Sequence, residues 1–298
     1  MTNRQTVVRK SLAVVTLLGM LIGLYRFAIR PGQLHWGATP EELARPLPGD
    51  HLVAAPSLRA TRAVTIAGRP QDIWPWIVQI GYDRAGFYGY DLIENLGSTR
   101  GIRSAGKLVP ELQCLSIGDR VYMSRIAYLV IQSMTPYRFL VWADPEDHPA
   151  GAFTFGLFPV DEKHTRLVIR ARLRYHWTEP RIMLDLFTEF GDHVAVPRML
   201  LGIKDRVEGR RVEPFAAQGF EIAVWLAALF ELVAAVILIF VWQRWWRAWI
   251  LALLSGLTLL FALYAREPSC IGALLDTGIL AAMLFGWSRN EPSHTILE

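Results

Sequence analysis

Three long apolar stretches near the C-terminus constrain the fold of this chain more than any other feature. They run over residues 222–243, 248–265 and 271–287. Each is about long enough to cross a bilayer as a helix, and only Glu231 and Asp276 carry a charge inside them. The sequence therefore predicts a bundle of three transmembrane helices over residues 220–288, followed by a polar tail at 289–298.

The two acidic residues inside these stretches predict polar contacts between the helices. An unpaired charge in a bilayer costs at least about 2.5–3.5 kcal/mol, so both carboxyl groups should face the bundle interior. At a rise of about 1.5 Å per residue, Ser255 lies at the depth of Glu231, and Thr258 at that of Asp276. We expect the pairs Glu231–Ser255 and Asp276–Thr258, or one shared cluster. These residues form either helix–helix hydrogen bonds or part of a proton or ligand path.

A fourth apolar segment, residues 11–29, follows the basic residues Arg4, Arg9 and Lys10. This pattern fits both a cleaved signal peptide and a retained membrane anchor. No small-residue cleavage site follows the segment, which favours an anchor over residues 1–30.

The basic residues that flank the apolar stretches predict on which side of the membrane the middle domain lies. The basic N-terminus favours an internal N-terminus, and Arg244 and Arg247, within a tryptophan cluster at 242–249, agree. Basic residues at 204–211 favour the opposite arrangement. We expect a multi-pass protein of the cell membrane whose middle domain lies outside the cytoplasm.

Composition and motifs narrow the function. The formal net charge is only +4 and the basic residues form no runs interleaved with aromatic residues, so nucleic-acid binding is not expected. Cys114 and Cys270 are too far apart in the sequence to indicate a zinc site or a disulfide framework. No metalloprotease, phosphate-loop, dinucleotide-binding or nucleophile-elbow motif occurs, so we expect no metal, cofactor or catalytic residue. His193 could pair with Asp192, although a surface turn is the favoured interpretation.

A mixed domain is predicted over residues 59–212, after a proline-rich segment at 31–58 that reads as a linker or extended cover. β-rich segments predict strands at 59–67, 128–134, 137–143, 151–160 and 165–176. Helical spacing predicts a helix at 73–81 that Asp72 caps, and another helix from residue 180 onward. Gly191 and Pro197 are expected to break or kink the second helix.

The predicted strand at 165–176 has the clearest alternation in the chain. Its apolar face carries Leu167, Ile169, Ala171, Leu173 and Tyr175, and its other face carries Arg166, Arg170, Arg172 and Arg174. Alternation alone explains the arginine row, so we expect a solvated face rather than a phosphate site.

The stretch from Pro70 to Leu96 is the strongest candidate for a functional site. An apolar helix face is followed by GFYGYDLIEN, which crowds aromatic and polar side chains together. Pockets are apolar with a few placed polar groups, so this stretch predicts the mouth or lid of a cavity; the alternative is a polar loop covering a core edge. The candidate ligand-binding residues are Trp74, Tyr88, Tyr90, Asp91, Glu94, Asn95, Phe153, Phe155, Ile169 and Phe187.

Four segments resemble a known superfamily. They are WGATPEELARPLPGD (36–50), DIWPWIVQIGYDRAGFYGYDLIENL (72–96), LVPELQCLSIGDR (108–120) and MLLGIK (199–204). Over roughly residues 34–212 the chain is similar to the SRPBCC superfamily, the START and Bet v 1-like group with polyketide cyclase/dehydrase and lipid-transport members, and above all to its membrane-anchored bacterial members. The resemblance implies an α+β helix-grip fold, in which a curved antiparallel sheet surrounds a C-terminal helix and an apolar cavity, and it brings no catalytic residue. The short interval between Asp119 and Tyr128 predicts a truncated strand.

These observations predict a membrane-tethered module that binds a lipid or another hydrophobic small molecule, with the membrane itself as the second partner. Tethering raises the local supply of an apolar ligand. One alternative is a structural or partner-binding membrane subunit whose cavity is filled by its own side chains. Another is a cyclase/dehydrase- or hydrolase-like enzyme that uses Tyr88, Asp91 or Glu94 in the same cavity. The sequence predicts no particular protein partner.

Overall fold

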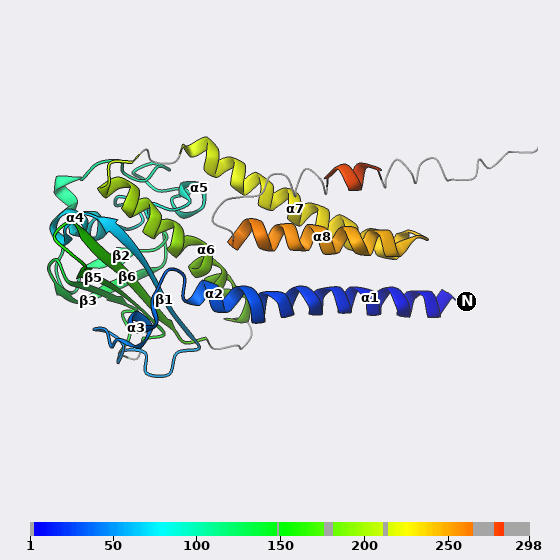
Figure 1. The fold of residues 1–298 in the computed structure, drawn as a ribbon, viewed down its shortest axis with the longest axis horizontal. Helices are drawn as coiled ribbons and strands as arrows, with labels where there is room; N and C mark the ends of the chain where they lie inside the picture. The colour runs from blue at the N-terminus through cyan, green and yellow to red at the C-terminus, as the bar shows by residue number, and fades with distance from the viewer. Residues whose placement is uncertain (1–2, 148, 176–180, 211–213, 265–276, 283–298) are drawn as a thin grey trace, which may run out of the picture. The chain divides into compact units, whose positions relative to one another are not determined.

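A computed structural model describes residues 3–147, 149–175, 181–210, 214–264 and 277–282 of the chain. The chain divides into two compact units, which are described separately (Figure 1). The first comprises residues 1–30 and 219–298, and the second comprises residues 31–218. We call them the helical unit and the mixed unit.

The helical unit contains helices long and apolar enough to cross a membrane. Helix α1 (Asn3–Leu24) continues through a π-helical turn (Tyr25–Ile29) into α2 (Arg30–Leu34), and α7 (Phe215–Val241) and α8 (Trp245–Tyr264) follow later in the chain. Tertiary hydrogen bonds join α1 to the end of α7, because Lys10 donates to the carbonyl oxygens of Phe240 and Trp242. Of the predicted span at 271–287, only the helical residues 277–282 lie within the described chain.

The mixed unit is built on one antiparallel sheet of six strands. They are β1 (Leu58–Ala67), β2 (Arg120–Tyr122), β3 (Tyr128–Thr135), β4 (Phe139–Ala143), β5 (Gly151–Pro159) and β6 (His164–Leu173). Their order is β1-β6-β5-β4-β3-β2, so the first strand pairs with the last. The three-residue β2 confirms the predicted truncated strand.

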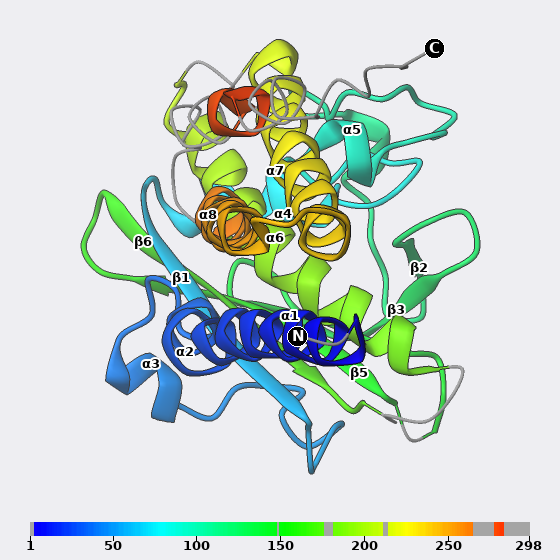
Figure 2. The ribbon, with the colours of Figure 1, turned by 90° about the vertical axis from the view of Figure 1, so that its right-hand side faces the viewer.

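Helices lie on both faces of this sheet (Figure 2). Helices α4 (Pro70–Val78) and α6 (Arg181–Val207) contribute to the apolar core on one face, which we call the inner face. The short α3 (Pro40–Ala44) lies on the other, outer face, and α5 (Asp91–Glu94) and a 3-10 turn (Pro110–Leu112) lie in the connection between α4 and β2. Asp72 is not the N-cap of α4 as predicted, because the helix begins at Pro70 with Arg69 as its N-cap.

Gly191 and Pro197 were predicted to break or kink the helix that begins near residue 180, and the prediction of a break is wrong. Helix α6 is continuous over 27 residues with Pro197 inside it. A proline removes one backbone hydrogen bond. Apolar residues on both sides of Pro197 are buried in the core, including Val196 and Leu200, and this packing stabilises the helix through the missing bond.

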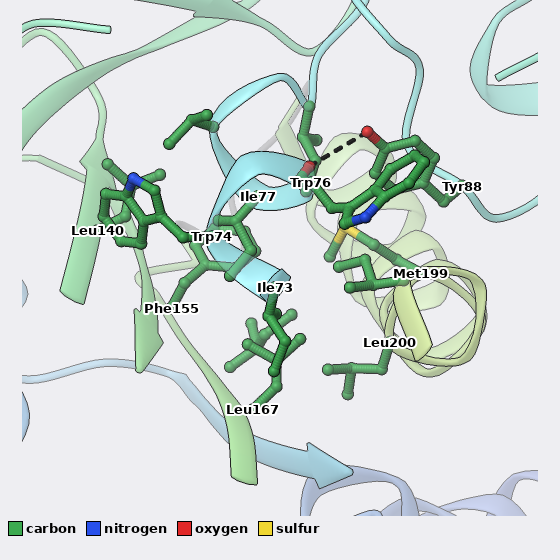
Figure 3. Close-up of a cluster of buried hydrophobic side chains, with 14 of the residues drawn as sticks. Ile73, Trp74, Trp76, Ile77, Tyr88, Leu140, Phe155, Leu167, Met199 and Leu200 are labelled. Carbon is green, nitrogen blue, oxygen red and sulfur yellow. Dashed lines mark hydrogen bonds between the residues drawn. The ribbon is translucent and has the colours of Figure 1, made fainter. Parts of the chain in front are cut away.

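The apolar core fills the space between the inner face of the sheet and helices α4 and α6 (Figure 3). Ile73, Trp74, Trp76 and Ile77 project into it from α4, because residues three and four apart share one helical face. Leu140, Phe155 and Leu167 reach it from the strands, and Met199 and Leu200 from α6.

The outer face of the sheet corrects the prediction of a solvated arginine row. Arg170 is only 1% exposed and donates to the Asp50 carboxylate (2.8 Å) and to the carbonyl oxygens of Arg45 and Glu42. Arg166 binds the Glu42 carboxylate at 2.7 Å. The alternation was read correctly, but the sequence did not show that residues 36–54 fold back over this face and accept its hydrogen bonds.

Candidate functional site

The candidate site begins at Tyr88, which joins α4 to α6. Its hydroxyl donates to the carbonyl oxygen of Trp76 (3.1 Å, Figure 3) and accepts from the Gln79 amide (2.8 Å). Burial raises the pKa of Tyr88, so the phenol keeps its proton at every physiological pH. Gly202 of α6 faces the Tyr88 backbone so closely that any β-carbon there would collide with its carbonyl oxygen.

Asp91 and Asn95 organise the loop that follows. The Asp91 carboxylate accepts from the hydroxyl of Ser104 (2.6 Å), from its backbone N–H (3.1 Å) and from the Asn95 side chain (3.2 Å). The backbone N–H of Asp91 donates to Gln218 at 2.9 Å. Asp91 and Asn95 are both buried, so this polar pair ties two ends of the loop together.

Glu94 is the unusual member of the site. Its Oε2 atom is buried and finds no hydrogen-bond partner among the residues that the structure describes. Burial, followed by the nearby Asp91 carboxylate, raises the pKa of Glu94 to about 8. Glu94 is therefore largely protonated at neutral pH, beside Tyr90, which is buried under the Arg198 guanidinium at 5.2 Å from its ring centroid.

Glu94 is expected to make the mixed unit less stable as pH rises. Its folded-state pKa of about 8 exceeds the ordinary 4.5, so the folded state holds the proton more tightly. Its contribution is complete below about pH 4.5, and is lost as pH rises through 8, by on the order of 4 kcal/mol. Hydrogen exchange of the 88–105 amides at pH 5 and pH 9 measures this loss.

Glu94→Gln should remove most of that pH dependence, because glutamine cannot ionise. The matched control is Glu111→Gln at an exposed position, which should keep the wild-type slope. Equal slopes for Glu94→Gln and the wild type would contradict the assignment.

The predicted cavity lining divides into buried and exposed residues. Trp74, Phe155 and Ile169 are buried in the apolar core, and Phe153 is half-buried against it. Phe187 does not face the interior as predicted, because 67% of it is exposed. The helical spacing correctly predicted that Met183 and Phe187 share one apolar face of α6. The prediction that this face points into the domain is wrong, because the face is exposed.

The N-terminal half of α6 has its polarity reversed relative to a helix of a soluble domain. Its exposed face is apolar: Ile182, Met183, Leu186 and Phe187, with Met183 70% exposed. Its buried face is acidic: Asp185, Glu189 and Asp192, each 7% exposed. Water normally selects the opposite arrangement.

A buried charged cluster on this acidic face was missed from the sequence. Arg62 of β1, 1% exposed, donates to the Asp192 carboxylate (2.7 Å) and to the carbonyl oxygen of Gln33 (2.8 Å). His193 lies beside them, 3.5 Å from the Arg62 guanidinium, and is not in the predicted surface turn. Burial raises the pKa of Asp192, but Arg62 and His193 more than offset this and hold it below its usual value.

One sequence signal could have found this cluster. In β1, Arg62 stands on the same side as Val64 and Ile66, which face the core. A basic residue on a core-facing position requires a buried acidic partner, and α6 supplies it.

The intramembrane candidates lie in the helical unit. Glu231 is 3% exposed and accepts a hydrogen bond from the Thr277 hydroxyl. The predicted partner Ser255 is fully buried, but its hydroxyl has no hydrogen-bond partner among the described residues, so the Glu231–Ser255 pair is not formed. Thr258 is half-buried, and Asp276 lies outside the described part of the chain.

Comparisons with known proteins complete the description. No family model and no curated protein matches the chain. Solved structures that match part of it include a conserved protein of unknown function from Enterococcus faecalis (16% identity, 54% of this chain, 80% of the other, TM-score 0.31). A polyketide-cyclase-like protein from Corynebacterium glutamicum also matches, with 12% identity over 50% of this chain and 91% of the other and a TM-score of 0.32. The Aha1 dimer from Colwellia psychrerythraea matches with 12% identity over 51% of this chain and 96% of the other and a TM-score of 0.29. These TM-scores are low, so the likeness carries no conclusion about the function of this chain.

Proposed function

We propose that this protein is a membrane-tethered module that binds a lipid or another apolar small molecule through the N-terminal half of α6. The reversed polarity of that helix carries the proposal. Four large apolar side chains, Ile182, Met183, Leu186 and Phe187, form one exposed surface, which we call the α6 apolar face. Contiguous exposed apolar surface on a folded unit is characteristic of a binding site.

The buried side of α6 explains why the helix keeps this orientation. Turning it to bury Phe187 would move Asp192 away from Arg62 and leave a buried guanidinium without its carboxylate. Losing one partner of a buried pair costs about 3–5 kcal/mol, more than the roughly 1.5–3 kcal/mol gained by burying a phenylalanine. The ion pair therefore holds the α6 apolar face outward, ready for an apolar ligand.

The chain's connectivity gives this face a source of ligand. The mixed unit starts inside the helical segment Arg4–Leu34 and ends inside α7, and both segments are long and apolar enough to cross a membrane. A unit held at both ends in this way stays within a few residues of the bilayer, where apolar molecules are concentrated.

Photo-crosslinking tests the proposal with the full chain in vesicles of phosphatidylcholine that carry a diazirine-labelled fatty acid. Mass spectrometry should locate crosslinks at residues 182–187, and at Phe153 or Phe155 if the ligand also enters the core. Met183→Asp combined with Phe187→Asp should reduce the α6 crosslinks several-fold, because the charge disfavours apolar contact.

Ile126 supplies the matched control. It is 92% exposed in the loop between β2 and β3, and Ile126→Asp should leave the α6 crosslinks unchanged. Labelling confined to residues 1–30 and 219–298, with α6 no stronger than the 126 region, would contradict the proposal.

A partner-binding membrane subunit is the second candidate, and the filled core favours it. Trp74, Trp142 and Phe155 are buried in the apolar core on the inner side of the sheet, where the resemblance implied a cavity. In that case the α6 apolar face would contact another protein. The same crosslinking experiment separates the two, because a face that binds only a protein should be labelled by the fatty acid no more strongly than the region around residue 126.

The catalytic alternative keeps one supporting observation. A carboxyl group buried beside aromatic rings with a raised pKa is the feature it requires, and Glu94 has it. Tyr88 and Asp91 are instead engaged in hydrogen bonds that hold the loop.

A further inference from the structure

The helical unit contains a pocket that is separate from the proposed binding face. Its volume is about 590 Å³, within the range of sites for drug-sized molecules. It lies between α1 and α8 and is lined by Arg9, Leu12, Ala13, Thr16, Trp245, Trp246, Trp249 and Ile250.

The lining is apolar and aromatic along most of its length. Leu12 and Ile250 expose aliphatic surface, and Trp246 is 52% exposed. Trp249 is fixed in place, because its indole N–H donates to the carbonyl oxygen of Ala13 at 2.9 Å. This hydrogen bond joins α8 to α1, so the two helices that line the pocket are held together by a tertiary contact.

Among the described residues, the charged side chains of α1 and of the segment 242–249 are all basic. Lys10 donates to the carbonyl oxygens of Phe240 and Trp242, which places the start of α1 beside the end of α7. The turn after α7 adds Arg244, the start of α8 adds Arg247, and Arg9 lines the pocket itself. No aspartate or glutamate occurs in residues 1–30 or 232–266.

We propose that this pocket binds one anionic phospholipid. Arg9 contacts the phosphate, and an acyl chain runs along Leu12, Ala13 and Ile250. Tryptophan rings pack at the level of the headgroup, where their apolar bodies and polar edges are both accommodated. The long apolar lining requires an acyl chain, and the basic rim selects an anionic headgroup.

This inference rests on the proposed membrane placement of α1, α7 and α8, and it does not depend on the α6 apolar face. The full chain is purified in a mild detergent with equal amounts of phosphatidylglycerol and phosphatidylcholine, and native mass spectrometry counts the retained lipid. We expect one retained phosphatidylglycerol, favoured about fivefold over phosphatidylcholine, as one basic contact near the headgroup provides.

Two variants separate headgroup from chain recognition. Arg9→Gln should abolish the preference for phosphatidylglycerol while some lipid is retained, and Trp246→Ala should reduce retention of both lipids. Arg26→Gln and Phe240→Ala are the matched controls, because both residues belong to the helical unit and lie outside the pocket lining, and both should behave as wild type.

Three results would overturn the inference. They are no lipid retained by the wild type, equal losses in the pocket and control variants, and displacement of phosphatidylglycerol by excess inorganic phosphate, which would assign the site to a free anion. Because crosslinking at α6 reports on a different surface, either proposal can fail while the other stands.

Discussion

Replacing Asp192 with asparagine is expected to destabilise the mixed unit by about 3–5 kcal/mol, the cost of breaking a buried ion pair. Arg62 is 1% exposed and would keep its charge without the carboxylate that it contacts at 2.7 Å. Hydrogen exchange of the amides of β1 and α6 in the full chain measures the loss, because this pair joins the two elements. Asp205→Asn, on the same helix but half-buried, is the control and should change stability by about 1 kcal/mol or less.

A double variant distinguishes the ion pair from simple packing. Arg62→Leu with Asp192→Leu removes both charges and should recover most of the stability, since replacing a buried pair by apolar residues is often neutral. The double variant should also crosslink less at Phe187, because α6 is then free to turn that side chain inward. A single Asp192→Asn variant as stable as the control would show that Arg62 is not dependent on this carboxylate.

Replacing Arg170 with methionine is expected to release the segment that covers the outer face of the sheet. The guanidinium donates to the Asp50 carboxylate, to the carbonyl oxygens of Arg45, Glu42 and Leu43, and to the Thr61 hydroxyl. Hydrogen bonds of charged groups contribute about 1.5–3 kcal/mol each, and the acceptors left buried would be unsatisfied. The expected loss is at least about 3 kcal/mol.

Limited proteolysis of the full chain measures this release. Cleavage within residues 36–56 should become several-fold faster in Arg170→Met. Arg174→Met, at the next outward position after Arg172, is the matched control and should be cleaved at the wild-type rate. Protection that is unchanged in Arg170→Met would mean that apolar contacts such as Leu47 with Val168 hold the segment without the arginine.

The two experiments test buried arginines on opposite faces of one sheet: Arg170 on the outer face and Arg62 on the inner face. On the outer face, arginines anchor the proline-rich cover. On the inner face, a single arginine sets the rotation of α6, and that rotation decides which side chains a ligand meets. In the proposed function, the surface that meets an apolar ligand thus depends on a buried charge that contacts no ligand.

Local patterns in the sequence were sufficient to predict most of the strands and the long helices. Alternation with a period of two identified β1 and β6, because alternate side chains must separate a core from a second face, and β-rich composition identified β3, β4 and β5. Uninterrupted apolar runs identified α7 and α8, because a bilayer requires a minimum length. The crowded loop from Tyr88 to Asn95 was singled out by its polar and aromatic side chains, and its role as a binding site stays a prediction.

Only the tertiary structure decided what packs against the arginine face of the sheet and against each face of α6. Alternation showed that Arg170 points away from Ile169, but burial beneath residues 36–54 depends on contacts more than a hundred residues away in the chain. Helical spacing found Met183 and Phe187 on one face of α6, yet the direction of that face is set by Asp192 meeting Arg62 on β1. In the same way, the raised pKa of Glu94 arises from burial, which no local pattern encodes. A sequence determines which side chains share a face; whether that face meets water, lipid or a buried charge is settled by the long-range packing that places another element against it.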